Sequence, residues 1–164
     1  MAGTGADTFN PNDSITRAQF ATMFYRFAGS PETSDNSVFT DLTQDWYKKP
    51  IAWAAANGIL NGTGNNMFSP DEVITREQIA AIFYRYAKTK GIDVSFGEDI
   101  NISYDDYNDS GEIADYALIP MSWCFSRSIM HPAELTGYYG IFPKAAPTRA
   151  DTAMMFLKFS YVFE

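Results

Sequence analysis

Residues 62–78 read GTGNNMFSPDEVITREQ, and residues 3–19 read GTGADTFNPNDSITRAQ. Extended to residues 62–87 and 3–28, the two stretches align without a gap at an offset of 59 residues and match at 14 of 26 positions. Self-similarity at a fixed spacing is typical of repeat proteins, in which each repeat is one supersecondary unit. The sequence therefore predicts a chain built from repeated helix–loop–helix units.

A third and more divergent copy follows the second at an offset of 73 residues. Pro143, Thr148-Arg149, Phe156 and Lys158 take the places of the matching proline, Thr-Arg pair, phenylalanine and basic residue. The added length falls in residues 97–111 and 131–146. We therefore expect the third repeat to keep the helical frame and to carry longer connections.

Five helices are predicted, in two kinds. Apolar residues recur at spacings of three and four in residues 16–28, 75–87 and 148–163, as in helices with one buried face. Two other helices, roughly 46–57 and 113–127, each contain a Pro-x-x-Trp element. Proline is tolerated only in the first turn of a helix, so a proline placed later should bend it. The fold class expected is all-α.

The repeats are expected at residues 1–36, 37–96 and 97–164, together forming one compact domain. The first of them lacks its leading helix, so the helix at 16–28 is expected to have a bare apolar face. We expect this helix either to pack against the helix at 148–163 or to form a homodimer by taking a partner from a second copy.

Composition excludes several classes of function. Twelve basic and twenty acidic residues give a net charge of −8, which disfavours binding to a phosphate backbone. No apolar run reaches the roughly 20 residues that a membrane span requires, and the start of the chain has no signal-peptide pattern. The single cysteine, Cys124, is expected to be buried and inert. Aromatic residues, 16% of the chain, suit either a dense core or a sugar-binding surface.

The element Ile-Thr-Arg-x-Gln predicts a helix start with a capping box, in which the threonine and the residue three positions later cap each other. Capping does not explain the arginine, because a cation at the first helical position faces the positive end of the helix dipole. Arg17, Arg76 and Arg149 all occupy that position. Two explanations stay open here: the arginines bind an anionic ligand, or they pair with acids of the chain itself, such as Asp13, Asp41 or Glu77.

Several elements occur in an order and at a spacing that resemble one S-layer homology (SLH) repeat. They are Phe39-Thr40-Asp41, Trp53–Asn57 with Gly58-Ile59-Leu60, Gly62-Thr63-Gly64, Phe68–Asp71 and Ile74–Gln78. The resemblance implies three helix pairs about a pseudo-threefold axis and an extracellular module that attaches surface-layer proteins or secreted enzymes noncovalently to the cell wall. The implied partner is a secondary cell-wall polysaccharide that carries acidic pyruvate ketals, and no cofactor is implied.

The resemblance also implies site residues. Arg17, Arg76 and Arg149 match the signature arginine, which contacts the acidic cap in grooves between units. Asp41 and Asp109 match the acidic residue that opens the first helix of a repeat, and Gly64 and Trp46 complete the expected ligand-binding set. The third repeat lacks the Gly-Thr-Gly element and has Asp151 in place of the glutamine. We therefore expect its groove to be impaired and at most two grooves to be complete.

Other functions have weaker support. Residues 106–111 match the first half of a calcium loop, but Ala117 stands where the bidentate glutamate should be, so a solvated acidic loop is expected. His131 is the only histidine, and no nucleophile or acid pairs with it at a recognisable spacing, so an enzyme is not expected. The alternative function is a noncatalytic protein–protein interaction module on the cell surface.

Overall fold

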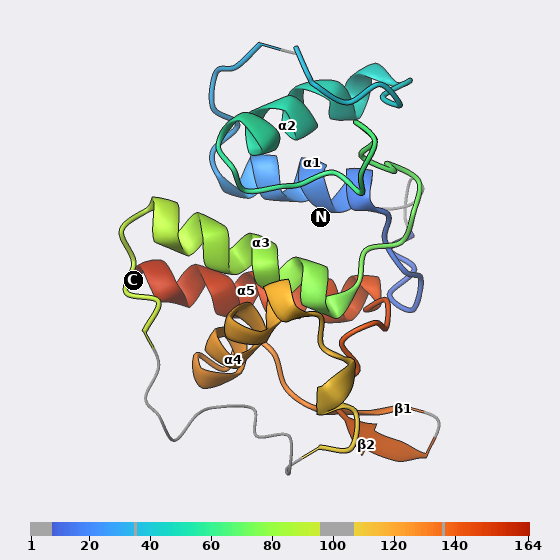
Figure 1. The fold of residues 1–164 in the computed structure, drawn as a ribbon, viewed down its shortest axis with the longest axis vertical. Coiled ribbons are helices and arrows are strands. Elements are labelled where there is room, and N and C mark those ends of the chain that lie inside the picture. Colours follow the sequence, from blue (N-terminus) through green and yellow to red (C-terminus); the bar gives the residue numbers. More distant parts are fainter. Residues whose placement is uncertain (1–7, 35, 96–106, 136) are drawn as a thin grey trace. The chain divides into compact units, whose positions relative to one another are not determined.

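The computed structural model describes residues 8–34, 36–95, 107–135 and 137–164 (Figure 1). Within them the chain is mostly helical, as predicted, with five α-helices and one small two-stranded hairpin. The chain forms two compact units, Met1–Ile74 and Thr75–Glu164, which are described separately. The pseudo-threefold arrangement of the repeats stays a prediction.

The first unit contains helix α1, Arg17–Phe27, and helix α2, Asp45–Ala56, within a residue of the predicted bounds. The two helices lie side by side (Figure 1). The Trp53 ring of α2 lies 6.4 Å from the Phe24 ring and 5.5 Å from the Tyr25 ring of α1. The apolar face of the helix at 16–28 that was expected to be bare is therefore packed against α2, and the homodimer stays a prediction.

The second unit contains helix α3, Arg76–Thr89, helix α4, Leu118–Ser126, and helix α5, Arg149–Ser160, which continues as the 3-10 turn η4, Tyr161–Phe163. Phe159 of α5 lies at the centre of their contacts. Its ring stacks on Phe83 of α3 at 4.2 Å and meets the Trp123 ring of α4 edge-on at 6.4 Å. All three rings are fully buried.

The helix expected at 113–127 begins later than predicted. Residues Ser110–Glu112 and Asp115–Ala117 form the short 3-10 turns η2 and η3, and α4 starts at Leu118. The physical reason is Pro120, which then occupies the third position of α4, where its missing N–H has no partner to lose. Pro50 differs, because it lies at the sixth position of α2 and leaves the Trp46 carbonyl without its usual helical donor.

A β-hairpin departs from the all-α expectation. Strands β1, Ala133–Leu135, and β2, Tyr138–Gly140, pair antiparallel with Leu135 opposite Tyr138. Gly137, in the connection between them, has a φ of 77°, a left-handed conformation that glycine adopts without steric cost. The hairpin lies in the added length of the third repeat, where the sequence shows no helical spacing.

Cys124 is buried, as predicted, and burial raises the pKa of its thiol far above the ordinary value. Of the helices that the structure describes, none has the length and apolar character needed to cross a membrane.

Candidate functional site: the helix starts and the loops they hold

All three Thr-Arg elements form the predicted capping boxes. The hydroxyls of Thr16, Thr75 and Thr148 accept from the backbone N–H of the residue three positions on, at 3.2, 3.4 and 3.1 Å. The side chains of Gln19, Gln78 and Asp151 accept in return from the threonine N–H groups, at 3.0, 3.2 and 3.1 Å. The shorter aspartate of the third repeat therefore closes its box as well.

The Arg17 side chain is buried and bonds to a loop of the next repeat. Its Nε donates to the carbonyl of Phe68 at 2.8 Å, and its Nη2 donates to the carbonyl of Asn61 at 2.9 Å. The guanidinium also lies 4.6 Å from the centre of the Phe68 ring, within reach of a cation–π contact. Arg17 thus joins the start of α1 to the loop that precedes α3.

Arg76 repeats this arrangement in the second unit. Its Nε donates to the carbonyl of Ile141 at 2.9 Å, and its Nη2 donates to the carbonyl of His131 at 2.6 Å. Burial lowers the pKa of Arg76, while the negative charges of Asp151 and Asp109 act against that shift. A guanidinium titrates so far above neutral that the side chain stays charged. Arg149 is likewise buried at the first position of α5.

The first backbone N–H groups of these helices are also used by the following loop. In α1, the N–H of Arg17 donates to Glu72 and that of Ala18 donates to Pro70, at 2.8 and 3.0 Å. In α3, the equivalent groups donate to Ala145 and Pro143, both at 3.0 Å. Since the third N–H bonds to the capping threonine, these two helix starts do not offer their first-turn donors to an anion.

The two aspartates expected at the site bind the same loops from the other side. Asp41 accepts from the backbone N–H groups of Phe68 at 2.9 Å and Ser69 at 2.7 Å. Asp109 accepts from Ile141 at 3.1 Å and Phe142 at 2.6 Å. Asp41 lies four residues before α2, so the expectation that it opens the helix is wrong, and Asp109 immediately precedes the turn η2.

An arginine and an aspartate therefore both form hydrogen bonds with the same residue of each loop. In the first unit, the carbonyl of Phe68 accepts from Arg17 and its N–H donates to Asp41. In the second unit, Ile141 is held in the same way by Arg76 and Asp109. We call this arrangement the loop clamp. It gives the arginines partners that neither sequence-based explanation foresaw, because the acceptors are backbone carbonyls.

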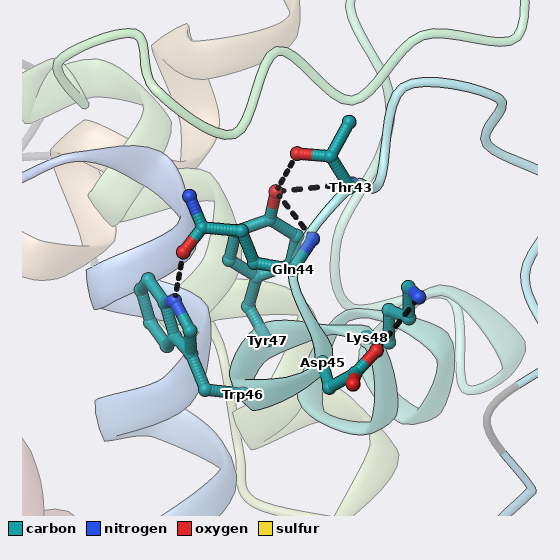
Figure 2. A network of polar contacts seen from close by, with 6 residues as sticks. All are labelled: Thr43, Gln44, Asp45, Trp46, Tyr47 and Lys48. Carbon is teal, nitrogen blue, oxygen red and sulfur yellow. Dashed lines mark hydrogen bonds and ion pairs between the residues drawn. The ribbon is translucent and has the colours of Figure 1, made fainter.

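Gly64 and Trp46, the remaining predicted site residues, are exposed in the first unit. Gly64 has a φ of 118°, and its carbonyl accepts from the N–H of Met67 at 2.8 Å in a tight turn. Trp46 projects from the first turn of α2 with 48% of its surface exposed, and its indole N–H donates to Gln44 at 2.8 Å (Figure 2).

Tyr47 fixes the start of α2, as Figure 2 shows. Its hydroxyl accepts from the backbone N–H groups of Thr43 and Gln44, both at 3.2 Å, and lies 3.1 Å from the Thr43 hydroxyl. The tyrosine is fully buried, so it holds the exposed Trp46 beside it in place, with the two rings 4.8 Å apart. A nearby open hollow of about 360 Å³ is lined by Asn36, Ser37, Phe39, Leu42 and Lys48.

Glu77 is a buried acid that the sequence offered as a possible partner of the arginines. Its carboxylate accepts from the Lys144 ammonium at 2.7 Å, from the Tyr116 hydroxyl at 3.1 Å and from the Ala114 N–H at 3.1 Å. It therefore links α3 to the segment before α4 and to the loop before α5. The first and third repeats have alanine at this position, and that difference is the signal that could have singled it out.

The metal prediction falls partly outside the described residues, since the calcium-like segment begins at Asp106. Across the described ranges, no group of three or more His, Cys, Asp or Glu side chains is placed to hold a metal ion.

Comparison with known sequences decides the family. The profile of the S-layer homology domain matches residues 1–21 and 38–80, which include Arg17, Asp41, Gly64 and Arg76. Residues 1–21 and 38–80 belong to the S-layer homology family. The SLH domain is a noncatalytic module that anchors proteins to the cell wall.

Related proteins carry this domain as a small part of their length. The chain is 35% identical over 153 residues to an endoglucanase of Bacillus sp. (strain KSM-635), covering 93% of this chain and 15% of the relative. It is 31% identical over 146 residues to exoglucanase XynX of Acetivibrio thermocellus, covering 88% of this chain and 13% of the relative. It is 28% identical over 158 residues to the surface-layer 125 kDa protein of Lysinibacillus sphaericus, covering 95% of this chain and 12% of the relative. The chain thus spans about one seventh of these relatives, and their enzymatic names describe whole proteins.

Proposed function

We propose that this SLH module attaches the protein that carries it to a secondary cell-wall polysaccharide by binding acidic, pyruvylated sugars at the bacterial surface. The observation that carries the proposal is that the family's motif residues meet at one loop of the first unit. Arg17 and Asp41 clamp that loop, and Gly64 forms an exposed turn in it. Trp46 is exposed on the first turn of α2 in the same unit.

In this proposal the arginines act by positioning. Arg17 and Arg76 use Nε and Nη2 on carbonyl oxygens, so each holds a loop in one conformation and places a permanent positive charge beside it. A carboxylate of the glycan is attracted to that charge, while sugar rings stack on the exposed indole of Trp46. Binding of a neutral or locally acidic glycan is also compatible with the net charge of −8.

The test is binding of the purified chain to cell-wall polysaccharide that has been stripped of protein. We expect binding, and we expect it to be lost when the ketal-linked pyruvate is removed by mild acid. Trp46→Ala should weaken the affinity about tenfold or more, as loss of a stacking residue does. Tyr161→Ala is the matched control, because Tyr161 is an aromatic side chain with 52% exposure on η4 and is not one of the predicted ligand-binding residues. Equal binding before and after acid treatment would contradict the glycan proposal.

A protein–protein interaction module is the second candidate. It is favoured by Met154, Leu157 and Tyr161, which recur at helical spacing along α5 and η4 and are 54%, 47% and 52% exposed. If this surface binds the partner, Leu157→Lys should abolish attachment to intact walls and leave binding to stripped polysaccharide unchanged.

A further inference from the structure

The first unit contains two Asn-Gly pairs, Asn57-Gly58 and Asn61-Gly62. Asparagine is chemically labile in proteins, and it loses its side-chain amide most readily before glycine, because glycine has no Cβ to obstruct the ring that forms between the two residues. The surroundings of the two pairs differ in the folded chain. That difference determines which of the two asparagines can react.

Hydrogen bonds hold Asn57-Gly58 at the end of α2. The side-chain amide of Asn57 donates to the carbonyl of Trp53 at 2.8 Å, and the N–H of Gly58 donates to the carbonyl of Ala55 at 3.0 Å. Ring closure joins the Gly58 nitrogen to the side-chain carbonyl carbon of Asn57, so both bonds must break first. This pair is therefore protected.

Asn61-Gly62 lies outside the helices and strands, and both of its residues are exposed. Within the part of the chain that the structure describes, no residue accepts a hydrogen bond from the Gly62 N–H or from the Asn61 side-chain amide. Packing nevertheless requires the glycine, since a Cβ on Gly62 would meet the Met67 carbonyl oxygen and the Phe39 ring. A reactive pair is thus kept in an open part of the loop.

Arg17 lies where it can stabilise the reactive form of this pair. Its Nη2 donates to the Asn61 carbonyl oxygen at 2.9 Å. That oxygen and the Gly62 nitrogen belong to one peptide group, so removal of the N–H proton places negative charge on both atoms. A charged donor already fixed at the oxygen stabilises this anion, as preorganised donors stabilise developing charge.

We propose that Asn61 is a site of spontaneous deamidation and that Arg17 promotes the reaction. The deprotonated Gly62 nitrogen attacks the side-chain carbonyl carbon of Asn61. A carbon–nitrogen bond forms, and the side-chain nitrogen leaves as ammonia after taking up a proton from water. Water then opens the resulting succinimide at either carbonyl, which gives aspartate or isoaspartate. Both products add a negative charge to the residue that Arg17 binds.

The isoaspartate product changes the loop clamp. Its main chain runs through the former side-chain carbon, so the backbone of the loop gains one methylene. The carbonyl that accepted from Arg17 becomes a free carboxylate, and the guanidinium then pairs with a full negative charge of its own chain. The modification does not depend on glycan binding. A further consequence, weaker attachment to an acidic glycan as the protein ages, rests on the proposed function.

The experiment ages the purified chain at mildly alkaline pH, both folded and unfolded in guanidinium chloride. Tandem mass spectrometry measures conversion of amide to carboxyl at each asparagine, and an isoaspartate-specific methyltransferase identifies isoaspartate. In the folded chain Asn61 should react about tenfold faster than Asn57 or more, because two hydrogen bonds protect Asn57. In the unfolded chain the two rates should be similar. Equal rates in the folded chain would overturn the proposal.

Arg17→Met tests the part assigned to the guanidinium, because it removes the charge and keeps a long apolar side chain. The rate at Asn61 should fall severalfold, and continued protection of Asn57 reports that the variant is folded. A faster or unchanged rate at Asn61 with Asn57 still protected would overturn the role of Arg17.

Polysaccharide binding by fresh and aged chains separates this proposal from the proposed function. Weaker binding by the aged chain supports both. Deamidation at Asn61 in a chain that did not bind the polysaccharide when fresh would support the modification site and contradict the proposed function. Equal binding by fresh and fully deamidated chains would contradict the effect on attachment.

Discussion

At the scale of single residues, the chain ends two equivalent helices with different residues in the same conformation. After α2, Gly58 has a φ of 66°, and after α4, Ser128 has a φ of 54°. Both ends are closed by the same bond, from Ile59 to Ala54 at 2.9 Å and from Ile129 to Cys124 at 2.8 Å. The backbone thus imposes the left-handed position, and serine adopts it at a cost that glycine avoids.

We predict that Ser128→Gly stabilises the protein by about 1 kcal/mol, and that Gly58→Ser destabilises it by a similar amount, because left-handed backbone costs an L-residue about 1–2 kcal/mol. A Cβ added at Gly58 would have no atom within 4 Å, so the second change measures the backbone effect without a steric clash. Urea unfolding monitored by circular dichroism gives both values. Opposite signs, with Ser128→Gly destabilising, would show that the serine side chain contributes contacts that outweigh its strain.

At the scale of elements, the loop clamp makes each loop depend on one aspartate. Asp41 bonds to two backbone amides of the loop before α3, with its Oδ1 at 2.9 Å from Phe68 and its Oδ2 at 2.7 Å from Ser69. Asp109 does the same for the loop that follows the hairpin. A carboxylate shared by two amides fixes a turn that no regular secondary structure supports.

We predict that Asp41→Asn lowers the free energy of unfolding by about 2–3 kcal/mol. The asparagine side chain keeps one oxygen that can accept from a loop N–H, but its NH₂ group cannot accept from the other. Asp45→Asn is the control: Asp45 is exposed and pairs with Lys48 at 2.8 Å on the surface of α2, so little change is expected. Denaturant titrations of both variants make the comparison. Equal effects of the two substitutions would show that the clamp contributes nothing to stability.

Helix α5 contributes the centre of the second unit through Phe159. We predict that Phe159→Ala costs about 3–5 kcal/mol, as a fully buried aromatic residue truncated to alanine does. Phe156, whose ring meets Phe83 edge-on at 5.3 Å, is only half-buried, so Phe156→Ala should cost less. Thermal unfolding of the two variants compares their losses of stability. A larger loss for Phe156→Ala would mean that Phe156, and not Phe159, faces the core.

At the scale of the whole molecule, the three repeats are unequal. The loop of the third repeat contains a hairpin in place of a Gly-Thr-Gly turn, and the buried Glu77 bonds to Lys144 within it. The second repeat contains every sequence element on which the resemblance to an SLH repeat rests. We therefore expect the contribution to wall binding to differ between the repeats.

We predict that Arg149→Lys reduces affinity for the wall polysaccharide much less than Arg17→Lys, because Arg17 clamps the loop that carries Gly64. Lysine keeps the charge but cannot reproduce the two bonds that Arg17 makes to the carbonyls of Phe68 and Asn61. Titration calorimetry, on variants shown to be folded by circular dichroism, measures the two losses. Equal losses would mean that the third repeat binds glycan as well as the first two.

The sequence by itself determined the features that depend on near neighbours. Each capping box joins residues three positions apart, so Thr16, Thr75 and Thr148 could be placed at helix starts from the printed letters. The start of α4 also depends on near neighbours, because Pro120 is tolerated only in the first turn of the helix. The apolar spacing alone places that start five residues too early. Repetition identified the family, because its motif elements recur in order.

Only the tertiary structure decided which elements meet. Arg17 and Asn61 are 44 residues apart, and Glu77 and Lys144 are 67 apart, so no local pattern names these partners. The packed pairs, α1 with α2 and α3 with α4, each join helices of different predicted repeats. A buried guanidinium needs acceptors wherever the chain supplies them. The carbonyls that accept from Arg17 and Arg76 exist as acceptors only because the following loop folds back onto the helix start.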